Sequence, residues 1–283
     1  MYSRFSPCNR NAYTLVELAI VLVVVGFVVG AVLIGHDLLR SSQTRSALAQ
    51  IERYQHAVSV FRAKYNALPG DMNASLARTY GFAPRGAYAG EGDGDGVIEG
   101  VHADAARSNC GVCESAGETV LFWVDLSASS DINENLIGKN FVAATAANVP
   151  DKIAPAELEH YFPVARLGSK NYFYVYSKDR VNYFGLSAIG TVQADGVMRS
   201  IPMISAEQAY SIDRKIDDGY PQSGEVTAQY VNGGQVIWAG PADTSAATPA
   251  VSGCYDNNNE AGAPQHYSVS ANGDNCALSF RFH

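Results

Sequence analysis

An apolar run of membrane length near the start of the chain limits what the rest can fold into. From Tyr13 to Gly35 the chain has 23 residues, of which only Glu17 is expected to carry a charge. About 20 apolar residues in a helix are enough to span the hydrocarbon core of a bilayer. A carboxylate inside such a segment is costly and usually has a partner. The pattern therefore predicts a transmembrane helix over residues 13–35 with one functional acid near its beginning.

A short basic leader, residues 1–12, precedes the apolar run and contains Arg4 and Arg10 but no acid. A secretory signal peptide carries an apolar core of its own before its cleavage site. This leader has none, so the apolar run would stay in the protein after cleavage. Because arginines before a membrane helix favour the cytoplasmic side, we expect the bulk of the chain on the opposite side of the membrane.

The string Asn-Ala-Tyr-Thr-Leu-Val-Glu-Leu over residues 11–18, behind a basic leader, resembles the processing site of type IV pilins and of the pseudopilins of type II secretion. The resemblance implies cleavage between Ala12 and Tyr13 by prepilin peptidase and methylation of Tyr13. It also implies that Glu17 pairs with the N-terminal amine of a neighbouring subunit, and such buried charges compensate each other only when both are present. Ala12 and Tyr13 stand where the family usually has Gly and Phe. The alternative is an ordinary signal anchor.

The helical pattern continues beyond the apolar run and ends at Pro69-Gly70, a helix stop. Apolar side chains recur there at spacings of three and four residues, which form one stripe along a helix. The stripe consists of Leu48, Ile51, Tyr54, Val58, Phe61 and Tyr65. One helix from Tyr13 to Tyr65 would be roughly 80 Å long. We expect its first part in lipid or a filament core, and residues 36–65 packed on a globular domain.

Residues 66–283 are expected to form one extracytoplasmic globular domain. Aromatic and β-branched residues predict strands over 170–177 and 181–188, joined by a hairpin turn at Lys178-Asp179-Arg180, and over 235–239 and 277–282. Short helices are predicted over 114–130 and 205–216, and an exposed loop over 240–265. The expected fold is α+β and pilin-like, with a long N-terminal helix packed on an antiparallel β-sheet and extra short helices.

Four cysteines would remain after cleavage removes Cys8, namely Cys110, Cys113, Cys254 and Cys276. Disulfides persist on the extracytoplasmic side of the membrane. We expect disulfides, and a tight bridge Cys110–Cys113 with a loop closed by Cys254–Cys276 is one connectivity that the sequence allows. A four-cysteine zinc site and a redox Cys-x-x-Cys are the alternatives. In the pilin-like family a disulfide-bounded loop often lies near the C-terminus.

An acidic, glycine-rich stretch over residues 91–99 is the sharpest chemical pattern outside the membrane segment. Carboxylates at alternate positions can converge on one cation, and calcium takes six to eight oxygen ligands. The candidate calcium ligands are Glu91, Asp93, Asp95, the carbonyl of Val97, and Glu99. The stretch resembles the first nine positions of an EF-hand-like loop, with His102 where an EF-hand has its closing glutamate, so Glu99 or Asp104 would complete the shell. The alternative is an acidic turn without metal.

Asp213, Asp217 and Asp218 form a second acidic group, of which Asp217 and Asp218, with Gly219, are interpreted as a helix-ending turn. The formal net charge of −8 disfavours generic nucleic-acid binding, which depends on neutralising phosphates. The six histidines are scattered, and the sequence has no Gly-x-Ser-x-Gly, phosphate loop or His-Glu-x-x-His. No enzymatic activity is therefore predicted.

The resemblance implies a structural subunit, a minor pilin or pseudopilin, of a type IV pilus or a type II secretion filament. Its partners would be prepilin peptidase, other pilin-like subunits, an inner-membrane assembly platform and membrane lipid. The precursor would cross the bacterial inner membrane once, with a cytoplasmic leader and a periplasmic C-terminal domain, before it enters the filament. The alternative function is an uncleaved, membrane-anchored, calcium-dependent binding module for adhesion or DNA uptake.

Overall fold

The structure, a computed structural model, divides into two compact units, residues 1–42 and 43–283, and each is described by itself. Only the backbone is described at His36 and Asp37. The residues described are 14–85, 90–101, 109–128, 156–168, 170–192, 197–231, 253–257, 263–270 and 273–283.

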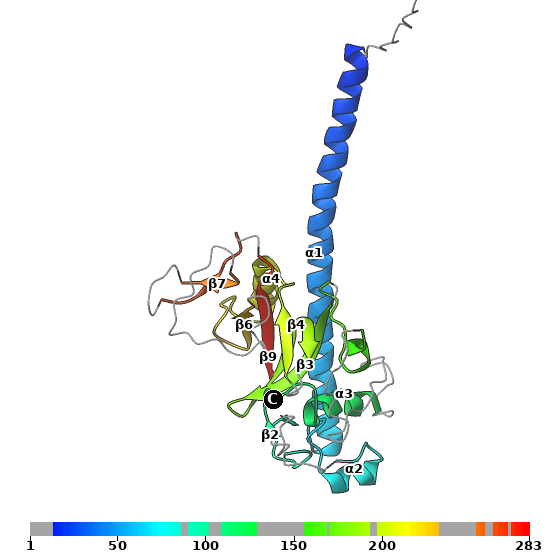
Figure 1. Cartoon of the computed structure of the whole chain (residues 1–283), viewed down its shortest axis with the longest axis vertical. Coiled ribbons are helices and arrows are strands. Elements are labelled where there is room, and N and C mark those ends of the chain that lie inside the picture. Colours follow the sequence, from blue (N-terminus) through cyan, green and yellow to red (C-terminus); the bar gives the residue numbers. More distant parts are fainter. Residues whose placement is uncertain are drawn as a thin grey trace, which may run out of the picture. The chain divides into compact units, whose positions relative to one another are not determined.

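Helix α1, Leu15–Tyr65, passes through both units (Figure 1). It begins with a reciprocal cap, in which Thr14 N–H donates to Glu17 Oε2 at 2.8 Å and Glu17 N–H donates to Thr14 Oγ1 at 3.2 Å. Such a capping box satisfies backbone donors that have no partner within the helix. The helix ends where Asn66 adopts a left-handed conformation with φ 53°, as the predicted stop signal requires.

The first unit contains the apolar part of α1. Its large apolar side chains are exposed, from Leu15 at 87% to Val32 at 52%. Among the residues that the structure describes, α1 is the one helix long and apolar enough to cross a membrane, with a mean hydropathy of 3.1 in its most apolar window. The prediction of an N-terminal helix of membrane length is thereby confirmed.

In the second unit, the remainder of α1 buries the predicted stripe, of which Ile51, Tyr54, Val58, Phe61 and Tyr65 are at most 7% exposed. The ring centroid of Tyr54 lies 5.3 Å from that of Phe173 and 5.1 Å from that of Trp123. Each fully buried large apolar side chain contributes about 1.5–3 kcal/mol. This packing, more than helix propensity, stabilises residues 43–65 as a helix.

The central sheet is antiparallel throughout, with the order β3-β4-β9-β6 and with β5 paired to the end of β4. In Figure 1 the strands β3, β4, β9 and β6 lie side by side. A tight hairpin joins β3 to β4, because Asp179 and Arg180 both have positive φ, at 52° and 63°, as a two-residue primed turn requires. The strands are β3 Asn171–Lys178, β4 Val181–Val192, β5 Met198–Ile201, β6 Val226–Tyr230 and β9 Cys276–Phe282.

The two faces of the sheet bury different kinds of side chain. Phe184 lies opposite Phe280 in the register, and because Tyr54 contacts Phe184, α1 covers this face. On the other face the buried hydroxyls of Tyr174 and Tyr176 pair with Ser187 at 3.0 Å and Ser279 at 2.6 Å. Alternation along each strand separates the two sets.

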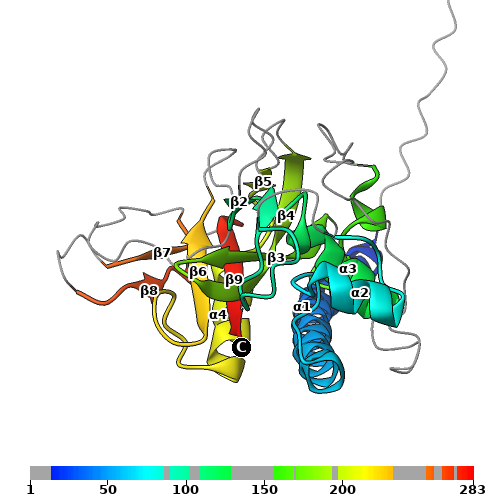
Figure 2. The same ribbon diagram turned by 90° about the horizontal axis from the view of Figure 1, so that it is seen from below.

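Shorter elements surround the sheet, and both views place α2 and α3 beside the C-terminal part of α1 (Figures 1 and 2). Helix α4 starts at a capping box between Ser205 and Gln208, so the predicted segment 205–216 includes its cap. The elements are α2 Ala74–Tyr80, α3 Glu118–Ala128, a 3₁₀ turn Leu158–His160, α4 Ala206–Ile216, and the strand pairs β1 Gly100–Val101 with β2 Asn109–Cys110 and β7 Tyr255–Asp256 with β8 His266–Tyr267.

The α+β expectation is confirmed, with some differences of detail. The predicted strand 235–239 lies outside the described residues, and β6 was not predicted. Within the predicted exposed loop 240–265, Cys254 and Tyr255 are buried, because β7 pairs with β8 and Cys254 is tied to the sheet. The structure contains the disulfides Cys110–Cys113 and Cys254–Cys276, with Cα–Cα distances of 5.4 and 4.9 Å.

Candidate metal centre

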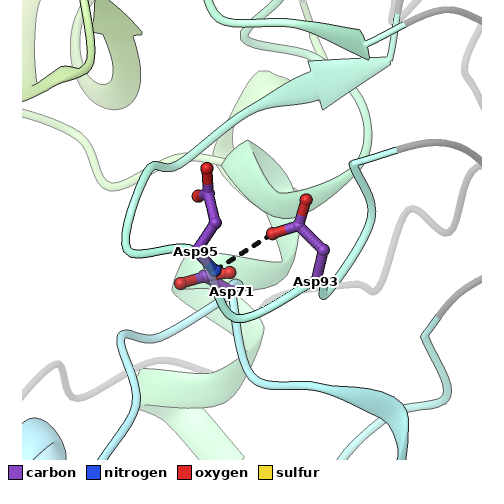
Figure 3. Close-up of side chains that lie close together, drawn as sticks. All are labelled: Asp71, Asp93 and Asp95. Carbon is purple, nitrogen blue, oxygen red and sulfur yellow. Dashed lines mark hydrogen bonds between the residues drawn. The ribbon is translucent and has the colours of Figure 1, made fainter.

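Three aspartates from two separate segments converge in the second unit (Figure 3). One carboxylate oxygen from each lies within 4.8 Å of the others. Asp71 follows the stop signal of α1, whereas Asp93 and Asp95 lie in the glycine-rich loop. We call these three residues the loop cluster.

Alternating glycines shape the loop around these acids. Gly90, Gly92, Gly94 and Gly96 all have positive φ, between 65° and 85°, which glycine adopts without steric cost. Asp93 Oδ1 then accepts Asp95 N–H at 3.1 Å, the bond drawn in Figure 3, and Asp95 Oδ1 accepts Val97 N–H at 2.8 Å. The loop is thus curled by its own carboxylates.

Asp71 is not part of the loop but holds it through two hydrogen bonds. Its Oδ1 accepts the N–H of Gly94 at 2.7 Å and its Oδ2 accepts the N–H of Gly96 at 2.8 Å. Asp71 itself is only 2% exposed. Burial, together with the charges of Asp93 and Asp95, raises the pKa of Asp71 above its usual range.

Glu118, the first residue of α3, holds the same loop from the interior. Its Oε1 accepts Gly92 N–H at 2.7 Å and its Oε2 accepts Glu99 N–H at 2.9 Å. The side chain is fully buried, and burial, reinforced by the charge of Asp71, raises the pKa of Glu118 far above its usual range. Both shifts arise first from burial, and the charges of neighbouring carboxylates add to them.

A positive charge would relieve this repulsion. Arg180, at the β3–β4 turn, supplies one contact, with Nη2 at 3.1 Å from Asp95 Oδ2, but its side chain is 72% exposed. The donors of the loop cluster are all carboxylate oxygens, which suit calcium and magnesium better than softer metals. An open cleft of about 490 Å³ reaches Asp71 and Asp95 from solvent and gives an ion a path of entry.

The structure brings together some of the predicted calcium ligands and not others. Asp93 and Asp95 lie in the loop cluster; Glu91 is buried and Glu99 is half-buried, and neither belongs to it. The N–H of Val97 is bonded to Asp95, and the N–H of buried Ile98 donates to Asn182 Oδ1 at 2.8 Å, which anchors the loop to β4. His102 and Asp104 lie outside the described residues.

Asp71 and Glu118 were not predicted for this site. Asp71 ends the string Leu68-Pro69-Gly70-Asp71, which was interpreted as a helix stop and not as part of a metal site. An acid directly after a stop signal could have been considered, but nothing local connects it with a loop more than 20 residues away in sequence. Glu118 reaches the loop only through the tertiary packing of α3.

A second group, which we call the turn cluster, consists of Asp213, Asp217 and Asp218, again with oxygens within 4.8 Å of one another. Asp213 accepts the hydroxyl of Tyr267 at 2.7 Å and the N–H of Gly219 at 3.0 Å. Asp217 accepts the N–H of Glu225, and Asp218 accepts the hydroxyl of Ser223 at 2.6 Å. These bonds tie the end of α4 to neighbouring segments, and the helix ends at Ile216, in agreement with the predicted helix-ending turn.

At the other end of the chain, Ala12 and Tyr13 lie outside the described residues, as does Cys8. Glu17 is exposed and bonded to Thr14. Comparison of the chain with known protein families, with curated proteins and with solved structures found no match.

Proposed function

We propose that this protein is a structural, pilin-like subunit, a minor pilin or pseudopilin, of a type IV pilus or type II secretion filament. The observation that carries the proposal is the Thr-Leu-Val-Glu-Leu string of residues 14–18 behind a basic leader, at the point where α1 begins. The precursor spans the bacterial inner membrane, and prepilin peptidase cuts it after Ala12 and methylates Tyr13.

The two parts of α1 support this role. Large exposed apolar surfaces mark membrane or protein contacts, and the apolar side chains of residues 15–34 are exposed. Lipid covers them in the precursor, and the helices of other subunits cover them in the filament after extraction by the assembly platform. Residues 43–65 of the same helix pack instead on the globular unit that the filament displays.

Glu17 acts during assembly. In the described chain its carboxylate is bonded to Thr14 through Oε2 at 2.8 Å. Cleavage creates an amine at Tyr13, and in an apolar filament core the charge of Glu17 is compensated by the amine of a neighbour. A retained leader would withhold this amine.

Calcium is the second part of the proposal. Asp71, Asp93 and Asp95 would hold the ion, with further oxygens from the backbone or water completing the shell. Calcium at this position would neutralise the loop cluster and stabilise the turn that follows α1. The carbonyl of Val97 remains a candidate ligand.

The deciding experiment is intact-mass and N-terminal peptide mass spectrometry of the protein from its native membrane. We expect a chain that starts at N-methylated Tyr13. The variant Ala12→Lys should retain the leader, whereas Ala12→Gly, which restores the family's usual residue, should be cleaved at least as well as the wild type. A wild-type chain that keeps residues 1–12 would contradict the proposal and favour the membrane-anchored, calcium-dependent binding module.

A further inference from the structure

We propose that helix α3 couples the calcium site to α1, because its two buried acids, Glu118 and Asp125, hold both chain segments that carry the loop cluster. Calcium binding then tightens the packing of α3 against residues 43–65 of α1. This inference rests on the calcium site of the proposed function and adds its regulation. It assigns Glu118 and Asp125 as positioning residues, since neither belongs to the loop cluster.

Glu118 holds the segment that carries Asp93 and Asp95. Its two oxygens accept the N–H groups of Gly92 and Glu99, at 2.7 and 2.9 Å. These two residues bracket the acids of the loop on either side. The loop can therefore close around an ion only in the position that the first turn of α3 defines.

Asp125 holds the segment that carries Asp71. Its Oδ2 accepts the N–H of Gly70 at 2.7 Å and pairs with the buried Arg85. Gly70 also lies directly on α3, since a Cβ added there would be 2.4 Å from the carbonyl oxygen of Glu118. Only glycine fits this approach at its φ of +84°, so Asp71 is placed by contact with the helix.

The same short helix contacts α1 and the sheet. Glu118 and Asp125 are seven residues apart and share one side of α3. Between them, Trp123 and Phe122 are fully buried. The ring of Trp123 lies 5.1 Å from that of Tyr54 of α1, and the ring of Phe122 lies 5.8 Å from that of Phe184 of β4.

The coupling follows from these contacts. Without a cation, the carboxylates of the loop cluster repel one another, and the force acts through Gly70, Gly92 and Glu99 on α3. With calcium bound, the two segments are drawn together around the helix. Because linkage is reciprocal, a change in the packing of α3 on Tyr54 must alter calcium affinity, although Tyr54 belongs to neither acid cluster.

The test uses the full chain in lipid nanodiscs with the substitution Trp238→Phe, which leaves Trp123 as the single tryptophan of the two in the sequence. Calcium binding is measured by calorimetry and Trp123 emission is followed in the same titration. We expect the emission to change with the same midpoint as binding. Glu118→Gln, which keeps the shape but offers one acceptor fewer, should weaken calcium binding about 10-fold and reduce the emission change.

Two further variants separate coupling from loss of structure. Tyr54→Leu should weaken calcium binding about fivefold by reciprocity. Ser127→Ala is the matched control on α3, because the hydroxyl of Ser127 donates within the helix, to Val124 O at 2.8 Å, and the variant should bind calcium like the parent. Asp93→Asn should abolish both binding and the emission change while Trp123 stays packed without calcium.

Calcium binding with no change in Trp123 emission, or with parental affinity in Glu118→Gln and Tyr54→Leu, would overturn the coupling and leave the calcium site intact. Absence of calcium binding in the parent would overturn the site and the coupling together. Subunit processing is judged separately, by the N-terminal mass.

Discussion

The loop cluster and the turn cluster place three aspartates at similar distances, yet the protein holds them in different ways. The loop cluster joins two segments that are remote in sequence; Asp93 and Asp95 are both exposed, and Asp95 lines an open cleft. The turn cluster forms within six residues at the end of α4. The spacing of the acids alone therefore does not determine the role of an acidic cluster. The residues around it decide how the repulsion between its carboxylates is relieved.

In the turn cluster, a proton on Asp213 can relieve the repulsion between the carboxylates. Burial raises the pKa of Asp213 to about 7, and the nearby charges of Asp218 and Asp217 contribute in the same direction. The hydroxyl of Tyr267 and the N–H of Gly219 bond both of its oxygens. In the loop cluster most of the bonded donors are backbone N–H groups of the loop itself, and we propose that a cation neutralises the remaining charge.

The largest expected effect concerns Asp125, the buried acid whose charge is compensated by the side chain of Arg85. Asp125 and Arg85 form an ion pair in which both side chains are 0% exposed. Arg85→Ala should lower the free energy of unfolding by about 3–5 kcal/mol, because it leaves a buried charge without its partner. Thermal unfolding measures the loss, which should persist in saturating calcium. Adding Asp125→Asn should restore part of the stability; no recovery in the double variant would contradict the ion-pair explanation.

The second prediction tests directly whether the clusters differ. Calcium at 100 times its dissociation constant should raise the free energy of unfolding by about 2.7 kcal/mol. Asp93→Asn should remove this stabilisation, while Asp217→Asn in the turn cluster should leave it unchanged. Differential scanning calorimetry with calcium or with a chelator gives the shift. If Asp217→Asn removed the stabilisation and Asp93→Asn did not, the ion would belong to the turn cluster.

The third prediction concerns the proton of the turn cluster. Since the folded-state pKa of Asp213 is about 7 against an ordinary value of 3.8, the folded protein keeps a proton that the unfolded chain loses. The contribution is fully present below pH 4, falls as the pH rises from about 4 to 7, and is absent above that range. We expect a difference of ~1–2 kcal/mol between these limits, because water at the turn screens part of the charge.

Asp213→Asn isolates this contribution, because an amide can still accept one hydrogen bond but does not titrate. Unfolding by denaturant at several pH values, in saturating calcium, should show a decline with pH in the wild type that the variant lacks. Parallel curves for the two proteins would show that the turn cluster is not relieved by a proton on Asp213.

The two clusters also show which parts of the structure can be predicted from local sequence patterns. The end of α4 before Asp217 was predicted correctly, because Asp217, Asp218 and Gly219 form one local signal. The same holds for α1, whose stripe has helical periodicity, and for the hairpin at Asp179-Arg180. The loop cluster was predicted only in its local half, Asp93 and Asp95.

The missing parts of the site depend on tertiary contacts. Asp71 reaches the loop because Asp125 holds Gly70, and Glu118 reaches it because α3 packs behind the loop. Neither contact leaves a periodic trace in the sequence. For the same reason β6 was missed: Val226–Tyr230 has two polar side chains among five residues, and its partner β9 lies about 50 residues further along the chain.

The smallest expected effect concerns Arg180, the exposed side chain that contacts Asp95 of the loop cluster. Exposed ion pairs contribute about 0–1 kcal/mol, so Arg180→Ala should barely change stability in the presence of a chelator. Because Arg180 competes with calcium for Asp95 Oδ2, at 3.1 Å, its removal should leave calcium affinity unchanged or raise it about twofold, within the same small free energy. Calorimetric titration of the variant decides this. A clear loss of calcium affinity would mean that Arg180 orients the loop for the ion. Both clusters would then depend on a side-chain donor from a neighbouring element, Arg180 for Asp95 and Tyr267 for Asp213.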